Sequence, residues 1–127
     1  MGYYENCAFP KPVTKKKKLL SNGYKDKKNR VCIYTGQRNA ERHEIFGGSN
    51  RQISVREKFQ IDVCREKHEE LQANVTEWAQ AENKRLKAVC QRVYMDKLVE
   101  SGLAEETALE IWMNLIGRNY IEELIPR

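Results

Sequence analysis

The chain carries a strand pattern within residues 59–68, FQIDVCREKH, which gives way to a helix pattern at the end of this stretch. Phe59, Ile61 and Val63 are apolar and alternate with polar residues. Successive side chains on a strand point to opposite faces, so this two-residue period predicts a β-strand over 59–64 with one buried face.

The period changes after Cys64. From there, apolar residues recur mostly at spacings of three and four, as they do on one face of an α-helix. We predict helix from about 65 to 100, with a break near Asn74 and an end at 101–102, where a glycine is found. Core packing is the simplest role for the apolar positions of this helix, which are Leu71, Val75, Trp78, Ala79, Leu86, Val89, Cys90, Val93, Tyr94 and Leu98.

Shorter elements are expected on both sides of this region. Residues 30–35, RVCIYT, are rich in β-branched and aromatic types and precede Gly36, which predicts a short strand and a turn. Residues 41–50 lead into a loop at their glycine pair, and a last helix is predicted over about 104–116. The expected fold class is therefore α+β, a small β-hairpin followed by helices. The inner face of the last helix carries Ala108, Ile111, Trp112 and Leu115.

Charge divides the chain into two parts. Its 127 residues suffice for one compact domain, which we place at 30–127. Residues 1–30 hold nine Lys/Arg against two Asp/Glu, whereas residues 31–127 hold 14 against 16, so a basic N-terminal arm over 1–29 supplies the positive charge. No apolar run has the length of a membrane span or the form of a signal peptide, so we expect a cytoplasmic protein with reduced cysteines.

A candidate metal site combines two cysteines with the two histidines of the chain. Cys64 and His68 are four residues apart, and residues one helical turn apart can bind the same ion. Cys32 and His43 complete a set of two sulfur and two nitrogen ligands, which suits Zn2+. Thr35 stands where a zinc knuckle would have its second cysteine. The alternative is that both cysteines are small buried residues and that His43 is a hydrogen-bonded loop residue.

Three segments resemble small phage-encoded proteins of the HNH type, the ββα-metal nucleases. They are residues 41–54, ERHEIFGGSNRQIS, the pair 63–64 with His68 after it, and residues 115–120, LIGRNY. The resemblance covers about 30–120 and implies an HNH-like or treble-clef-like fold stabilised by zinc. In a nuclease of this family, a metal ion holds the scissile phosphate and a histidine activates water.

The chain departs from the family pattern at two places. The family motif resembles ERHHIF, in which the first histidine binds metal and the second is the general base, and here the matching residues are His43 and Glu44. A solvated glutamate has a pKa of about 4.3 and is a weak base toward water. A further histidine, in a GVH-like motif, is missing from residues 69–74. General-base catalysis contributes about 10² to 10⁴-fold in rate, so we expect no catalytic residue and a loss of activity.

The resemblance implies a phage protein that acts in a bacterial host cell by binding. Small phage proteins without an enzymatic site commonly inhibit host defence, so the expected partner is a host protein or ribonucleoprotein complex, with Cas9 as the leading target of an anti-CRISPR protein. Mimicry of DNA would need an acidic chain, whereas this chain is basic. The arm predicts contact with nucleic acid or with an acidic protein face. The expected binding residues are Lys15, Lys16, Lys17, Lys18, Arg51 and Arg56.

Two alternatives stay open. The first is an active phage HNH endonuclease that cuts DNA with a divalent metal ion through His43, Glu44 and His68. The second is a DNA-binding accessory protein of phage replication or packaging.

Overall fold

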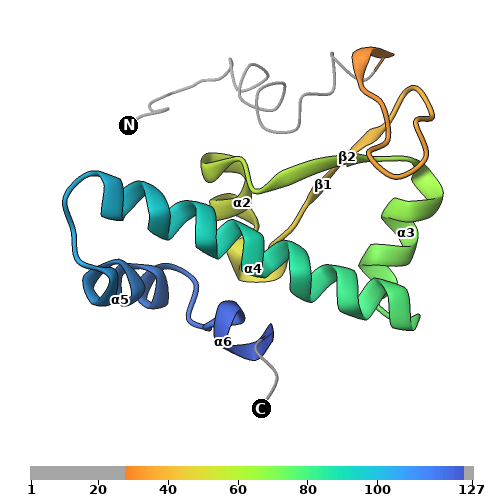
Figure 1. The fold of residues 1–127 in the computed structure, drawn as a ribbon. Helices are drawn as coiled ribbons and strands as arrows, with labels where there is room; N and C mark the ends of the chain where they lie inside the picture. The colour runs from red at the N-terminus through yellow and green to blue at the C-terminus, as the bar shows by residue number, and fades with distance from the viewer. Residues whose placement is uncertain (1–27, 125–127) are drawn as a thin grey trace, which may run out of the picture.

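The computed structural model describes residues 28–124 as an α+β fold built around one long helix (Figure 1). α4 crosses the middle of the molecule, with the β-hairpin on one side and α5 and α6 on the other. No helix in this part of the chain combines the length and the apolar composition that a membrane span requires. In chain order the elements are β1 (Glu41–Glu44), the 3-10 helix η2 (Gly48–Asn50), α2 (Arg51–Glu57), β2 (Gln60–Val63), α3 (Arg65–Ala73), α4 (Glu77–Glu100), α5 (Glu105–Leu115) and α6 (Tyr120–Leu124).

β1 and β2 form a two-stranded antiparallel hairpin. His43 pairs with Ile61, and Glu41 pairs with Val63, so these four side chains share one face of the hairpin. Val63 is fully buried on this face. The strand predicted over 59–64 is confirmed as β2, which is one residue shorter at each end.

The strand predicted over 30–35 is wrong. This segment forms a tight turn, in which the N–H of Gly36 donates to the carbonyl of Cys32 at 2.9 Å. Gly36 has a φ of 79°, a left-handed conformation that glycine adopts without steric cost, so the turn replaces a strand. The partner of β2 is instead Glu41–Glu44, whose four polar residues show no apolar alternation.

The helices predicted beyond Cys64 are confirmed, including the break between them. α3 ends at Ala73, and Asn74 closes it in a left-handed conformation with a φ of 56°. α4 then begins after Thr76, whose hydroxyl oxygen accepts a hydrogen bond from the N–H of Ala79 at 3.1 Å. This side-chain cap satisfies one of the free N–H groups at the start of the helix.

Three further helices surround this pair. α5 agrees with the helix predicted over 104–116, whereas α2 and α6 were not predicted. α2 has no buried apolar stripe and instead buries Ser54. The Ser54 hydroxyl donates to the carbonyl of Phe46 at 2.8 Å and lies 2.9 Å from the N–H of the same residue, which donates to it. This double contact fixes the loop between β1 and α2.

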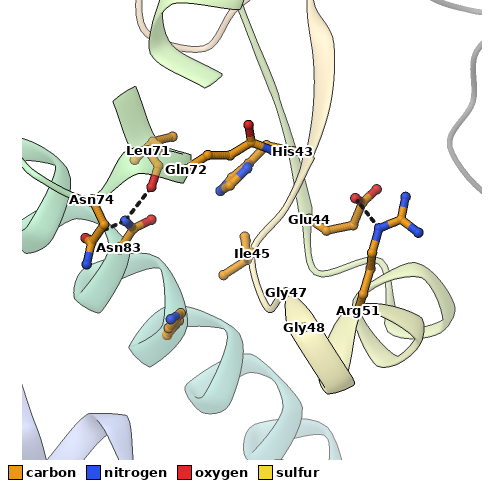
Figure 2. Close-up of a pocket in the computed structure, with 11 residues that line it drawn as sticks. His43, Glu44, Ile45, Gly47, Gly48, Arg51, Leu71, Gln72, Asn74 and Asn83 are labelled. Carbon is orange, nitrogen blue, oxygen red and sulfur yellow. Dashed lines mark hydrogen bonds and ion pairs between the residues drawn. The ribbon is translucent and has the colours of Figure 1, made fainter. Parts of the chain in front are cut away.

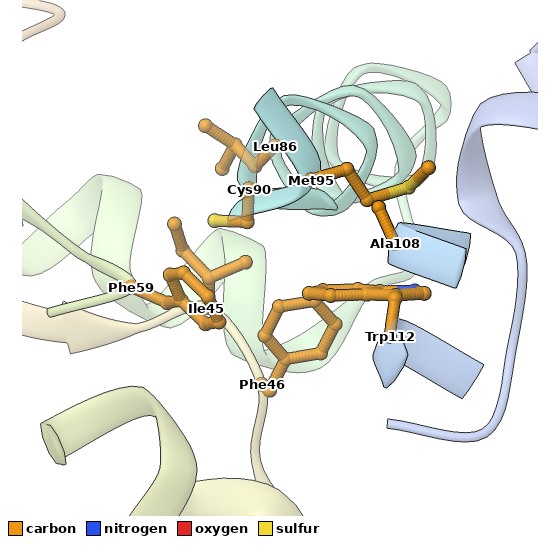
Figure 3. Packing of buried hydrophobic residues seen from close by; sticks show 8 residues of the cluster. All are labelled: Ile45, Phe46, Phe59, Leu86, Cys90, Met95, Ala108 and Trp112. Carbon is orange, nitrogen blue, oxygen red and sulfur yellow. The ribbon is translucent and has the colours of Figure 1, made fainter. Parts of the chain in front are cut away.

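Two clusters of buried apolar residues form the core. In the larger cluster, Phe46 and Phe59 pack against Trp112, which is fully buried (Figure 3). The indole N–H of Trp112 donates to the carbonyl of Arg118 at 2.8 Å, so this large side chain is buried without an unpaired polar atom. The larger cluster comprises Ile45, Phe46, Phe59, Leu86, Cys90, Met95, Ala108 and Trp112, and the smaller comprises Cys32, Ala40, Val63, Cys64 and Leu71.

Three apolar positions that we expected in the core are exposed. Val75 lies between α3 and α4 and is 74% exposed, and Val89 and Val93 on α4 are 46% and 47% exposed. The expectation of core packing is wrong for these residues. Val75 lies in the linker between the two helices, and the apolar stripe of α4 is wider than the surface that its neighbours cover.

Candidate functional site

The four predicted metal ligands come together as two separate pairs. Cys32 lies beside Cys64, and His43 lies beside His68. Within residues 28–124, no group of three or more His, Cys, Asp or Glu side chains is arranged to hold a metal ion. The tetrahedral set of four ligands is therefore not assembled, and zinc binding stays a prediction.

The sulfur of Cys32 accepts several hydrogen bonds, one of them from the backbone of Cys64. Burial alone would raise the pKa of the Cys32 thiol, but hydrogen bonds from Thr35, Cys64 and Tyr34 lower this pKa to about 6. The N–H of Tyr34 is 3.4 Å from the Cys32 sulfur. Thr35 occupies the position of the second cysteine of a zinc knuckle, and its hydroxyl bonds to Cys32. A thiolate at Cys32 suits a metal ion. Cys64 contacts this sulfur through its backbone N–H and belongs to the same buried cluster.

The histidine pair joins β1 to α3. The imidazole rings of His43 and His68 meet edge to face, with their centroids 5.2 Å apart. His68 is oriented by Glu41, whose carboxylate oxygen is 2.8 Å from His68 Nδ1. Glu41 also lies 3.5 Å from the guanidinium of Arg65 on α3. Glu41 thus contacts both His68 and Arg65, and it fixes the orientation of the His68 ring in the pair.

His43 is a buried and neutral imidazole with an unused nitrogen. Burial, and then the positive charges of His68 and Lys87, lower the pKa of His43 from 6.5 to about 4. The side chain is 6% exposed, and its Nε2 atom has no hydrogen-bond partner among the described residues. A buried polar atom without a partner costs about 1–3 kcal/mol, so such an atom points to a ligand or water that completes it.

Glu44 directs its carboxylate away from His43, toward the other face of the hairpin. Figure 2 shows His43 pointing toward α3 and Glu44 pointing toward Arg51. The guanidinium Nε of Arg51 lies 3.2 Å from one carboxylate oxygen of Glu44, and the amide of Gln60 lies 3.4 Å from the other. Adjacent residues of a strand point to opposite faces, so the sequence position after His43 does not bring this carboxylate to the imidazole.

A polar pocket opens in front of His43 (Figure 2). Its volume is about 450 Å³. Lys87 of α4 and Arg51 of α2 bring positive charge to its wall, and Asn83 is held in place by hydrogen bonds of 2.9 Å to the carbonyl of Leu71 and to the side chain of Asn74. The full lining is His43, Glu44, Ile45, Gly47, Gly48, Arg51, Leu71, Gln72, Asn74, Asn83 and Lys87.

A second, smaller hollow of about 240 Å³ continues along α4 toward α6. It shares Asn74, Asn83 and Lys87 with the first pocket and adds Gln80, Lys84, Arg118 and Tyr120. Amides and cations therefore line both hollows, and these groups are the usual partners of phosphate oxygens.

The predicted binding residues are only partly at this pocket. Arg51 lines it, whereas Arg56 does not and is paired with Glu57 at 3.1 Å. The predicted contacts at residues 15–18 lie outside the described part of the chain. Sequence reasoning missed Asn83 and Lys87, although their spacing of four places both on one face of a helix.

No protein-family model matches the chain, and no curated protein and no solved structure is significantly similar to it. The resemblance to HNH-type proteins accordingly rests on the sequence motifs alone.

Proposed function

We propose that this protein is an HNH-like binding protein that holds the backbone of double-stranded DNA in the His43 pocket and leaves it uncut. One observation carries the proposal. A buried neutral His43 presents an unpaired nitrogen beside a pocket with cationic and amide walls, while Glu44 is engaged elsewhere by Arg51.

The walls of the pocket support contact with phosphate. Lys87 supplies positive charge, whereas the charge of Arg51 is offset by Glu44, its ion-pair partner in the same wall. Contacts of cations with phosphate provide most of the non-specific affinity of proteins for DNA. His43 is neutral at pH 7, so its Nε2 can donate to a phosphate oxygen when the proton resides there. Nε2 is buried in the free protein, so we expect DNA binding to open a path to this atom and to supply the partner that it lacks.

The placement of Glu44 favours binding over cleavage. Metal-assisted hydrolysis needs a base near the scissile phosphate. Glu44, at the position of the family's general base, is paired with Arg51 and hydrogen-bonded by Gln60. A glutamate held in this way is a poor candidate for the base of the nuclease alternative, which the cleavage assay below tests directly.

Inhibition of a host defence complex such as Cas9 is the second candidate. This candidate is favoured by the HNH-type motifs together with Glu44, which stands in place of the histidine that serves as general base in the family. An HNH-like fold that lacks this base can still bind a partner. A zinc ion remains part of this prediction. Cys32 and Cys64 supply two sulfur ligands, and a tetrahedral site needs two more from outside this pair.

The test measures binding and cleavage on the same preparation. Binding of a fluorescein-labelled 20-base-pair duplex is followed by anisotropy between 50 and 200 mM salt. We expect Lys87→Ala to weaken binding and to lower the slope of log affinity against log salt by about one. Lys97→Ala removes an exposed lysine of the same helix outside the pocket and is the matched control.

Cleavage is followed on plasmid DNA with Mg²⁺ or Mn²⁺, in lanes that contain the protein alone, Cas9 with guide RNA, and both. Intact plasmid in the first lane and normal cutting in the third support DNA binding alone. Loss of Cas9 cutting without DNA affinity would select the inhibitor. Nicking by the protein alone that disappears in His43→Ala would select the nuclease and refute the proposal.

A further inference from the structure

An apolar groove runs along another face of α4. Its volume is about 540 Å³. One wall is formed by two rows of α4 side chains, and the other by the segment that leads from α2 into β2, including Phe59 and Ile61. The α4 rows are Leu86, Cys90, Tyr94 and Leu98 in the floor and Val89, Val93 and Lys97 along the edge.

The valines on the edge are unusual for a helix surface. Val89 and Val93 lie one turn apart and are about half exposed. β-branched residues form helices less readily than alanine, glutamate or lysine, so helix stability does not account for them. Together with the apolar floor they form one continuous apolar strip, and such strips mark binding surfaces.

The rim of the groove is positively charged. Lys58 on one wall and Lys97 on the other are exposed, and neither forms an ion pair with another described residue. Glu57, the acidic residue of the rim, is already paired with Arg56 at 3.1 Å. A second copy of the chain would bring lysines against lysines, whereas an acidic partner would find complementary charge on both walls.

We propose that this groove binds the apolar face of an acidic amphipathic helix from a partner protein. Helices commonly bind in this way, with apolar anchors at spacings of three, four and seven residues in a hydrophobic groove. The strip from Leu86 to Leu98 spans about 18 Å at the rise of an α-helix, which matches a partner helix of about three turns.

The groove shares one lining residue, Ile45, with the DNA pocket and otherwise uses different side chains. Lys87 and Asn83 line that pocket, whereas Val89, Val93 and Lys97 line the groove. The protein can therefore contact DNA and a protein partner at the same time, and the groove proposal does not depend on the DNA proposal.

The experiment uses a capped 14-residue fluorescein-labelled peptide with leucines at helical spacing and glutamates at the other positions. A control peptide carries lysine in place of every glutamate. We expect the full chain to bind the acidic peptide at least tenfold more tightly than the basic one, as measured by anisotropy.

Variants place the binding on the groove. Val93→Glu should lower the affinity for the acidic peptide at least tenfold, and Lys97→Gln should lower it at least threefold. Val99→Glu alters an α4 valine that is 38% exposed and does not line the groove, so it should bind as the wild type does. Circular dichroism and urea unfolding of each variant check that the fold is intact.

Three results would overturn the proposal. The first is equal binding of the two peptides, and the second is binding that Val93→Glu leaves unchanged. The third is a dimer in sedimentation that Val93→Glu converts to a monomer, because a second copy would then occupy the groove.

Discussion

Acidification is expected to destabilise the protein through His43. Burial with the nearby positive charges lowers the pKa of this imidazole from 6.5 to about 4. Between these values the unfolded chain binds a proton that the folded chain resists, so unfolding becomes more favourable as the pH falls. The stability that depends on neutral His43 is therefore fully present above pH 6.5 and is lost as the pH falls toward 4.

The size of this effect follows from the two pKa values. A single group that titrates at 6.5 when unfolded and at about 4 when folded lowers the free energy of unfolding by about 2 kcal/mol between pH 7 and pH 5. His43→Leu removes the titrating group and keeps a side chain of similar size. The variant should lose about 2 kcal/mol less than the wild type over this range.

Urea unfolding followed by tryptophan fluorescence at pH 7, 6 and 5 measures both proteins. Carboxylates that titrate in this range are shared by the two chains, so they cancel in the comparison. At pH 7, His43→Leu should be at least as stable as the wild type, because it removes an unpaired buried nitrogen. Equal losses of stability in the two proteins would show that His43 is not buried in a neutral form, and the reasoning would fail.

Three other predictions concern stability and metal. Trp112→Ala should lower the free energy of unfolding by about 3–5 kcal/mol in urea titrations, because removal of a fully buried indole leaves a cavity. The control Met113→Ala, on the exposed side of α5, should change this free energy by less than about 1 kcal/mol. Thr76→Ala removes the cap of α4 and should cost about 1 kcal/mol in thermal melts, and an unchanged melting temperature would contradict the cap. Zinc binding predicts close to one equivalent of zinc in the purified protein by elemental analysis, with a lower content and melting temperature in Cys64→Ala; wild-type protein free of zinc would end that prediction.

Periodicity identified the parts of the fold whose own residues carry a pattern. β2, α4 and α5 each have apolar residues at the spacing of their structure, whereas α3 has one large apolar residue, Leu71. The break between α3 and α4 falls at Asn74, which has a left-handed conformation. β1 has four polar residues, so only its pairing with β2 makes it a strand. The segment 30–35 has strand-forming residues, yet hydrogen bonds around Cys32 bend it into a turn. Local composition could not reveal either outcome.

The site was predictable in part: Cys32 lies beside Cys64, Arg51 lines the pocket, and the two histidines form a pair. His43 and His68 were expected to lie close together, and their rings are 5.2 Å apart. A single site with all four ligands would require both cysteines to lie close to both histidines. No group of three ligands forms within residues 28–124, so the two pairs do not make one site there. Asn83 and Lys87 are more than 35 residues from His43 in the sequence and reach the pocket because α4 packs beside the hairpin.

The central claim is that DNA becomes the hydrogen-bond partner of His43 Nε2 and is not cut. The ¹⁵N chemical shift of this imidazole nitrogen measures the contact directly. The chain has two histidines, so its ring nitrogens give a simple ¹⁵N spectrum, which His68→Gln assigns. We predict that a 12-base-pair duplex in the presence of Mg²⁺ shifts the His43 Nε2 signal and stays intact throughout the titration. An unchanged His43 signal at saturating DNA, or cleavage of the duplex, would contradict the account.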